Sequence, residues 1–156
     1  MPNSVMVEAI HRFLEAVTGV PLLEQERLPT LAEALDRLAL AYHHIPEGAP
    51  GSDADPPRES DAALREEISR RFPELGLYAS VPPEEPSGAA LDCAPEVGDA
   101  VDDLTDVVGE MRAIVWRCKN VDEEDAAWHF RFGYRTHWGR HLHDLRRYLH
   151  LLMFEN

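Results

Sequence analysis

Hydrophobic residues recur at spacings of three and four near the start of the chain, which places them on one face of an α-helix. The first run predicts a helix over about residues 4–18, capped by Asn3 or Ser4. A capping box at residues 30–33 predicts that a second helix begins there and ends before Pro46. The chain therefore opens with two amphipathic helices.

Loop-like composition follows the second helix. Residues 46–59 hold four prolines, two glycines and several acids but no large apolar side chain, and they predict a mobile loop. Ser60 is expected to cap a short third helix, which ends before Pro73 because a residue that precedes proline disfavours helical geometry. Residues 73–94 are rich in proline and glycine yet include apolar side chains. They predict an extended segment packed on the bundle, with a short strand at 77–81.

Apolar residues alternate at spacings of four and three from Val97 to Cys118, the narrow seam of a helix with near-parallel neighbours. This fourth helix is predicted to end near Asn120. Acidic residues at 122–125 favour the first turn of a fifth helix, which is predicted to run to about Phe154. So short a connection makes the two helices antiparallel. The whole chain, residues 1–156, is thus expected to be one all-α domain: an antiparallel bundle of four main helices and the short third one, with long Pro-rich loops.

Composition narrows the partners that the surface can attract. The chain has 29 acidic and 15 basic residues, a net charge of -14, which repels phosphate backbones and anionic lipids. No run of about 20 apolar residues and no signal-like N-terminus is present. Cys93 and Cys118 lack CxxC spacing and are expected to be reduced. We therefore expect a cytoplasmic protein that binds neither nucleic acid nor membrane.

Polar residues interrupt the apolar face of the predicted fifth helix. Arg131 falls in the middle of that face, and His137 and His141 lie one turn apart along its edge. Because a buried charge needs a partner, Arg131 is expected to pair with Glu110, which the hairpin places at the same level. The histidines come level with a turn rich in aspartate: Asp99, Asp103 and Asp106. One interpretation is that these pairs form polar layers that fix the register of the two helices.

The same geometry supports a second interpretation, a metal site. Imidazoles four residues apart on one helix can bind the same ion, and facing carboxylates can complete or orient the site. Zinc, manganese or iron would suit such ligands, and His43 or His44 could add a third nitrogen. The ligands would then be His137, His141, Asp103 and Asp106.

Further features of the fifth helix concern its packing. Trp128, Phe130 and Phe132 diverge around the helix, so some of them are expected to lie under residues 73–94 or to form a partner surface. Gly139 within a helix indicates that another backbone approaches closely. The remaining histidines of this helix are expected in solvent: His129, His143 and His150.

The segment 128–141 reads Trp-His-Phe-Arg-Phe-Gly-Tyr-Arg-Thr-His-Trp-Gly-Arg-His, and residues 102–106 read Asp-Asp-Leu-Thr-Asp. Together they resemble a bacterial domain family of unknown function, DUF family 5063, and the stretch around Leu77 and Tyr78 also fits. The resemblance implies a compact helical protein in which the Asp-rich helix pairs with the His-rich one. It implies no activity.

No nucleophile elbow, glycine-rich phosphate loop or P-loop is found in the sequence. We therefore expect first a non-catalytic interaction or structural protein, without a cofactor, that binds a protein partner or itself. The alternative is a metal-binding bundle or metal-dependent hydrolase that uses the paired His and Asp residues with a divalent ion such as zinc or manganese.

Overall fold

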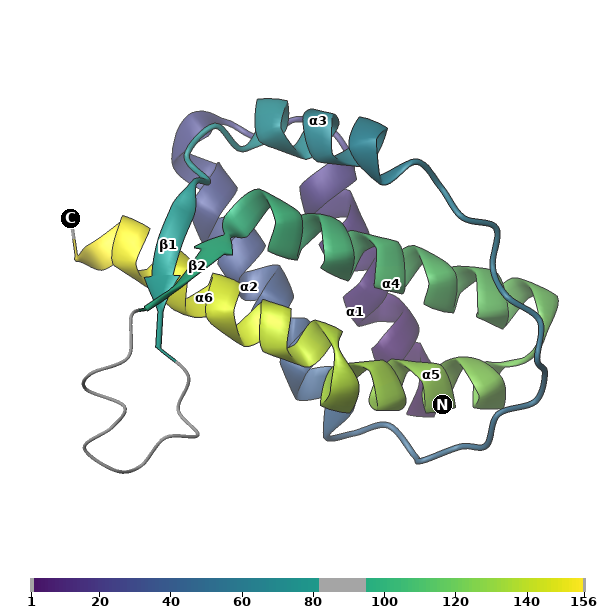
Figure 1. Ribbon diagram of the computed structural model, residues 1–156. Helices are drawn as coiled ribbons and strands as arrows, with labels where there is room; N and C mark the ends of the chain where they lie inside the picture. The colour runs from purple at the N-terminus through teal and green to yellow at the C-terminus, as the bar shows by residue number, and fades with distance from the viewer. Residues whose placement is uncertain (1, 82–94, 156) are drawn as a thin grey trace.

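Six helices and one pair of β-strands form the regular structure in the computed structural model, which describes residues 2–81 and 95–155 (Figure 1). The elements are α1 (Pro2–Thr18), α2 (Glu24–Tyr42), α3 (Asp61–Arg71), β1 (Leu77–Ser80), β2 (Glu96–Asp99), α4 (Ala100–Asn120), α5 (Glu123–Thr136) and α6 (Trp138–Phe154). The predicted helical class is confirmed, but the predicted count of four main helices plus one short helix is wrong.

The helices pack in two groups that share one core. α1 packs against α2, α4 packs against α5 and α6, and contacts between α2 and α6 join the groups. α3 lies across one end of α4, and the β1–β2 pair lies beside α6 (Figure 1). The largest fully buried side chains come from both groups and from the end of α3: Phe13, Phe72, Phe130 and Trp138. Among the described residues, no helix is both long and apolar enough to cross a membrane.

The first two helices begin earlier than predicted. α2 starts at Glu24 and runs through Pro29, so the capping box at residues 30–33 lies inside the helix. Glutamates in the first turn stabilise this earlier start, and Leu28 packs against the core. Pro29 costs the helix one backbone hydrogen bond and crowds the carbonyl of the preceding turn, and these contacts offset that cost. α1 starts at Pro2, which leaves both predicted caps within the helix: Asn3 and Ser4.

The predicted strand at residues 77–81 is present as β1. It pairs in antiparallel fashion with β2, with Tyr78 opposite Gly98. The predicted seam of the fourth helix wrongly included Val97, which lies in β2 and is 75% exposed. Asp99 then caps α4 by accepting hydrogen bonds from the first backbone N–H groups of the helix. Residues 82–94, the rest of the segment predicted to pack on the bundle, lie outside the described residues, as does Cys93.

The predicted fifth helix is two helices, α5 and α6, which meet at His137 with φ −148° and ψ −81°. Trp138 folds back onto Gly133, where a Cβ atom would lie 2.7 Å from the indole ring. A Cβ atom on Gly139 would lie 2.1 Å from the carbonyl oxygen of Tyr134, so a backbone does approach closely, but it is the end of α5, which the prediction placed in the same helix, and not a separate element. The apolar spacing continues through this break, and periodicity therefore could not reveal it.

The aromatic side chains of α5 point to different sides of the helix, as their spacing of two residues predicts. Phe130 is fully buried, whereas Trp128 and Phe132 stack with ring centroids 4.8 Å apart at the surface. Residues 73–81 do not cover them, because β1 lies at the opposite end of the α5–α6 pair (Figure 1). The segment beside α5 is instead the loop between α2 and α3, where Gly48 approaches the backbone of Glu124. The mobility of that loop stays a prediction.

Candidate metal centre

A polar cluster lies between α4 and the start of α6. Residues spaced by three and four bring one set of carboxylates onto a single face of α4: Asp103, Asp106 and Glu110. Opposite them are His137, at the junction of α5 and α6, and His141, one turn further on. The rings of the two histidines lie 4.9 Å apart. The two histidines therefore lie opposite Asp103 and Asp106, as the predicted helical hairpin placed them.

Each imidazole is held by a carboxylate at its Nδ1 atom. His141 Nδ1 lies 2.7 Å from Asp103 Oδ1, and His137 Nδ1 lies 2.8 Å from Glu110 Oε1. A carboxylate accepts hydrogen bonds, so these contacts favour a proton on Nδ1 of both rings. In the neutral imidazole the lone pair is then on Nε2, the form that a metal ion binds when a carboxylate orients the ring.

Both Nε2 atoms face the same oxygen of Asp106. The distances to Asp106 Oδ2 are 3.4 Å from His141 and 4.0 Å from His137, and neither contact qualifies as a hydrogen bond. Ligand atoms of the three residues all lie within 4.8 Å of one another. Two atoms that bind one zinc ion at about 2.1 Å are themselves roughly 3–3.5 Å apart. The 3.4 Å separation matches this range, and the 4.0 Å separation exceeds it by about half an ångström, which a small movement of the His137 ring would close.

The cluster is open to solvent on one side and carries excess negative charge. The side chains of His141, Asp106 and His137 are 27%, 37% and 47% exposed. Burial raises the pKa of Asp106, and the neighbouring histidines only partly offset this effect. The hydrogen bond with Asp103 raises the pKa of His141 despite burial. The first shift means that burial disfavours the negative charge of Asp106, and the second means that Asp103 favours a positive charge on the His141 ring.

Asp103, predicted as a ligand, lies on the other side of His141 from Asp106. Its Oδ1 atom contacts His141 Nδ1, and its Oδ2 atom accepts a hydrogen bond of 2.5 Å from the hydroxyl of Tyr78. Burial and the adjacent Asp103 carboxylate raise the pKa of Tyr78 far above its usual value, so the phenol keeps its proton. The sequence predicted a strand that contains Tyr78, but it did not predict that Tyr78 contacts the site.

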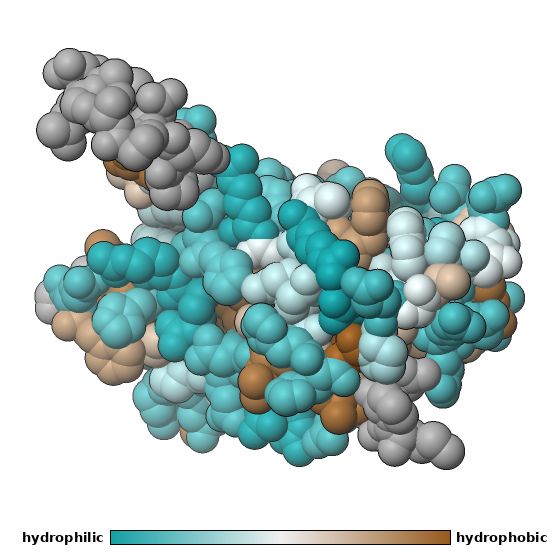
Figure 2. Space-filling view, turned by 90° about the horizontal axis from the view of Figure 1, so that it is seen from below, coloured by the Kyte–Doolittle hydropathy of each residue, from teal (hydrophilic) through white to brown (hydrophobic). Residues whose placement is uncertain are grey.

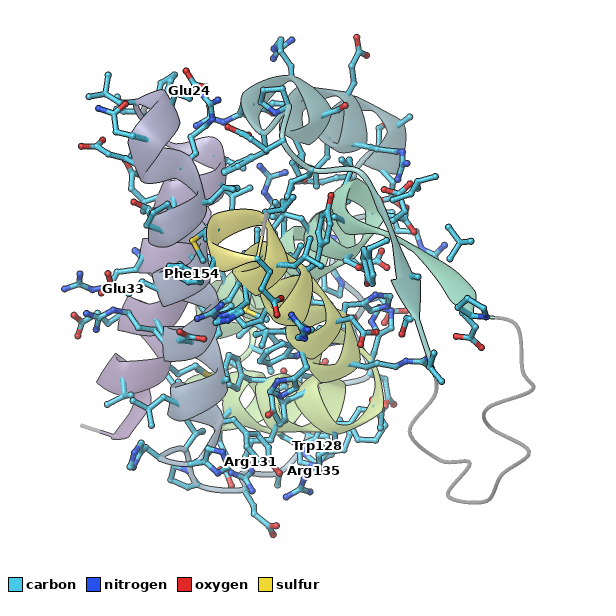
Figure 3. All side chains as sticks on the ribbon, turned by 90° about the vertical axis from the view of Figure 1, so that its left-hand side faces the viewer. Glu24, Glu33, Trp128, Arg131, Arg135 and Phe154 are labelled. Atoms are coloured by element: carbon cyan, nitrogen blue, oxygen red, sulfur yellow. The ribbon has the colours of Figure 1, made fainter. Side chains whose placement is uncertain are left out.

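Other predicted members of the site lie elsewhere. The pairing of Arg131 with Glu110 is wrong: Arg131 donates hydrogen bonds of 2.8 and 2.7 Å to the carbonyl oxygens of Tyr42 and Ile45 at the end of α2 (Figure 3). Figure 3 shows Arg131 at that end of the molecule together with Arg135. The cluster also lacks both histidines considered as a third nitrogen: His43 and His44. Asp99 caps α4 and pairs with Arg65.

A second polar group that the sequence did not predict lies beside the first. Asp125 is fully buried and accepts hydrogen bonds from Arg117 at 3.1 Å and from the backbone of Gly51 at 2.8 Å. His129 Nε2 lies 3.5 Å from Asp125, so the prediction that His129 is solvated is wrong. Arg117 and His129 line a recess of about 380 Å³ between α4 and α5. The other two histidines predicted in solvent are exposed: His143 and His150.

The fold and the cluster together define a class of protein: a helical bundle with a strand pair at one end and a site of histidines and carboxylates between two of its helices. The chain belongs to the family described as a domain of unknown function, DUF5063, whose model matches residues 4–155. The resemblance noted in the sequence is therefore confirmed. No curated protein matches the sequence.

The fold is similar to a crystal structure of protein BF1032 from Bacteroides fragilis, with a TM-score of 0.70. The similarity covers 99% of this chain and 91% of that one, at 16% sequence identity. At that level of identity, the likeness shows a shared fold alone.

Proposed function

We propose that the protein binds one divalent transition-metal ion through Asp106, His137 and His141. The observation that carries this proposal is the convergence of both Nε2 atoms on one oxygen of Asp106, at 3.4 and 4.0 Å, without a hydrogen bond at either atom. A layer that served only to fix helix register would gain more from direct hydrogen bonds at these atoms.

The ligand set also indicates the chemistry of the ion. Two imidazoles and one carboxylate suit zinc, manganese or ferrous iron, whereas magnesium and calcium prefer oxygen ligands. Three protein ligands on the protein side leave the solvent side for water or a small ligand, as in reactive rather than closed structural zinc sites. Asp103 and Glu110 orient the two rings from behind.

Titration of the metal-free protein with zinc against a chromophoric competitor tests the proposal. We expect one equivalent to bind with a dissociation constant of about 1 µM or tighter. His141→Ala and Asp106→Asn should each weaken binding by roughly 100-fold or more, since the first removes a ligand and the second removes the negative charge of one. His150→Ala is the matched control, because His150 is an exposed histidine on the same helix and lies outside the cluster.

The proposal fails if the wild-type protein takes up no stoichiometric zinc, manganese or iron. It also fails if His150→Ala weakens binding as much as His141→Ala, because the metal would then bind surface histidines in general. In either case the polar layer that sets helix register would be the better interpretation of the cluster.

A second candidate function, a cytoplasmic interaction protein, is favoured by a different feature. A groove of about 670 Å³ lies between α1 and α2, and Val20 and Leu23 beside it are 75% and 61% exposed. Hydrophilic side chains cover most of the face of the molecule in Figure 2, with hydrophobic patches scattered among them. If the groove mediates self-association, sedimentation should show a dimer that Leu23→Glu converts to a monomer.

A further inference from the structure

A chain of hydrogen bonds links the strand pair to the metal centre. The Tyr78 hydroxyl donates to one oxygen of Asp103, and the other oxygen of Asp103 accepts from His141 Nδ1. The side chain of Asp103 is only 9% exposed, so water has little access to it. Tyr78 is therefore a principal hydrogen-bond partner for the oxygen that His141 leaves free.

Several features of the fold hold Tyr78 in this place. Its β-sheet partner is Gly98, where a Cβ atom would lie 2.2 Å from the phenol ring, so the absence of a side chain lets the ring lie across the strand pair. The ring stacks on Tyr148 of α6, with centroids 5.1 Å apart. Tyr148 follows His141 by seven residues and therefore lies on the same face of α6. The hydroxyl of Tyr78 is thus aimed at Asp103 from a fixed ring.

We propose that Tyr78 is a positioning residue of the metal centre, which holds Asp103 so that His141 keeps its proton on Nδ1 and offers Nε2 to the ion. This inference rests on the proposed metal-binding function. The β1–β2 pair then contributes to the site through Tyr78, although none of the three proposed ligands lies in a strand.

The physical consequence of losing the hydroxyl follows from the burial of Asp103. Without Tyr78 as donor, one oxygen of a nearly buried carboxylate loses its partner, and the carboxylate can rotate toward other donors. His141 would then lose its fixed orientation and its single tautomer. Removal of a group that orients a metal ligand commonly lowers metal affinity by about 10- to 100-fold.

The experiment compares Tyr78→Phe with Tyr148→Phe. Both changes remove one hydroxyl and keep an aromatic ring in the same stacked pair, but the Tyr148 hydroxyl contacts the backbone N–H of Gly76 instead of the site. We expect Tyr78→Phe to weaken zinc binding by about 10- to 100-fold and Tyr148→Phe to change it by less than about threefold. Thermal unfolding of the metal-free variants reports whether either one loses its fold.

A second readout separates positioning from general stability. Nitrogen NMR of the histidine rings in the metal-free protein, at a pH high enough for the His141 ring to be neutral, should show the proton of His141 on Nδ1 in the wild type and in Tyr148→Phe. In Tyr78→Phe the His141 signals should move toward a mixture of tautomers. Asp103→Asn provides an independent variant, because an amide can donate to Nδ1 and should favour the opposite tautomer.

The outcomes distinguish this inference from the proposed function. If the wild type binds no metal, both are overturned. If the wild type binds zinc and Tyr78→Phe binds it equally well with an unchanged His141 tautomer, only the role of Tyr78 is wrong. Equal losses in Tyr78→Phe and Tyr148→Phe would likewise overturn the role of Tyr78, since they would reflect loosened packing of the ring pair.

Discussion

Arg131 shows how a half-buried cation can be held in place without an acidic partner. Its guanidinium binds the carbonyl oxygen of Tyr42, the last residue of α2, and that of Ile45 just beyond the helix, and its charge complements the helix dipole. It also lies over the Tyr42 ring, 4.7 Å from the centroid. The sequence predicted that Arg131 faces the core, but it could not predict a partner on a helix about 90 residues earlier in the chain.

Changing Arg131 to methionine should therefore destabilise the protein by about 2 kcal/mol, because two carbonyl oxygens lose a charged donor. A salt bridge to Glu110 would have made the same change nearly neutral. Arg135→Met is the control: Arg135 is exposed and contacts the Tyr42 hydroxyl, so a clearly smaller loss of stability is expected. Urea unfolding of both variants measures the difference, and equal effects would mean that the carbonyl contacts contribute little.

The break between α5 and α6 shapes the candidate site. His137 has a non-helical backbone at this break, and its ring reaches Glu110 while His141, one turn later, reaches Asp103. Glycines on both sides allow the helices to meet so closely: Gly133 leaves room for Trp138, and Gly139 leaves room for a carbonyl of α5. The sequence indicated the close approach through Gly139 but not the break, because the apolar spacing is the same on both sides.

Gly139→Ala should destabilise the protein by about 3 kcal/mol, since its Cβ atom would meet a backbone oxygen that cannot rotate away. Gly109→Ala is the matched control in the interior of α4, where nothing lies within 4 Å of the added Cβ atom. That change should stabilise the helix by about 0.5–1 kcal/mol. Thermal melts of the two variants should move in opposite directions, and a Gly139→Ala protein as stable as wild type would contradict the geometry of the break.

Across the entire protein, local sequence patterns predicted the helices and predicted that α4 faces the histidines. The hydrogen-bond partners within the site could not be predicted, because they come from distant segments of the chain. Tyr78 reaches Asp103 from a strand whose partner lies some 20 residues later, and Asp125 binds a loop about 70 residues earlier. Hydrophobic spacing carries no information about such pairs. The acidic residues at 122–125 illustrate this limit, since they predicted a helix start but not the burial of Asp125.

His129, in the polar group around Asp125, makes the stability of the folded protein depend on pH. Burial and the nearby Arg117 lower the pKa of His129, although the charges of Asp125, Glu110 and Asp55 oppose this. As pH falls through about 6.5, the unfolded chain takes up a proton at this histidine before the folded protein does, so His129 makes the fold less stable at lower pH. The raised pKa of His141 acts in the opposite direction, because its contribution is lost as pH rises.

Comparison of wild type with His129→Gln isolates the first effect, since both proteins keep His141. The stability of the wild type relative to the variant should fall as pH decreases through about 6.5. Urea unfolding at several pH values, with metal chelated, measures this difference. Parallel pH profiles would show that the surroundings of His129 do not disfavour its protonated form.

The arrangement of Asp106, His137 and His141 is tested most directly by a crystal grown with zinc and measured at the zinc absorption edge. We predict one anomalous peak about 2.0–2.2 Å from Nε2 of both histidines and from a carboxylate oxygen of Asp106, with Asp103 and Glu110 still at the Nδ1 atoms. A map without a peak at this position, in which the Nε2 atoms instead hydrogen-bond to Asp106, would contradict this prediction.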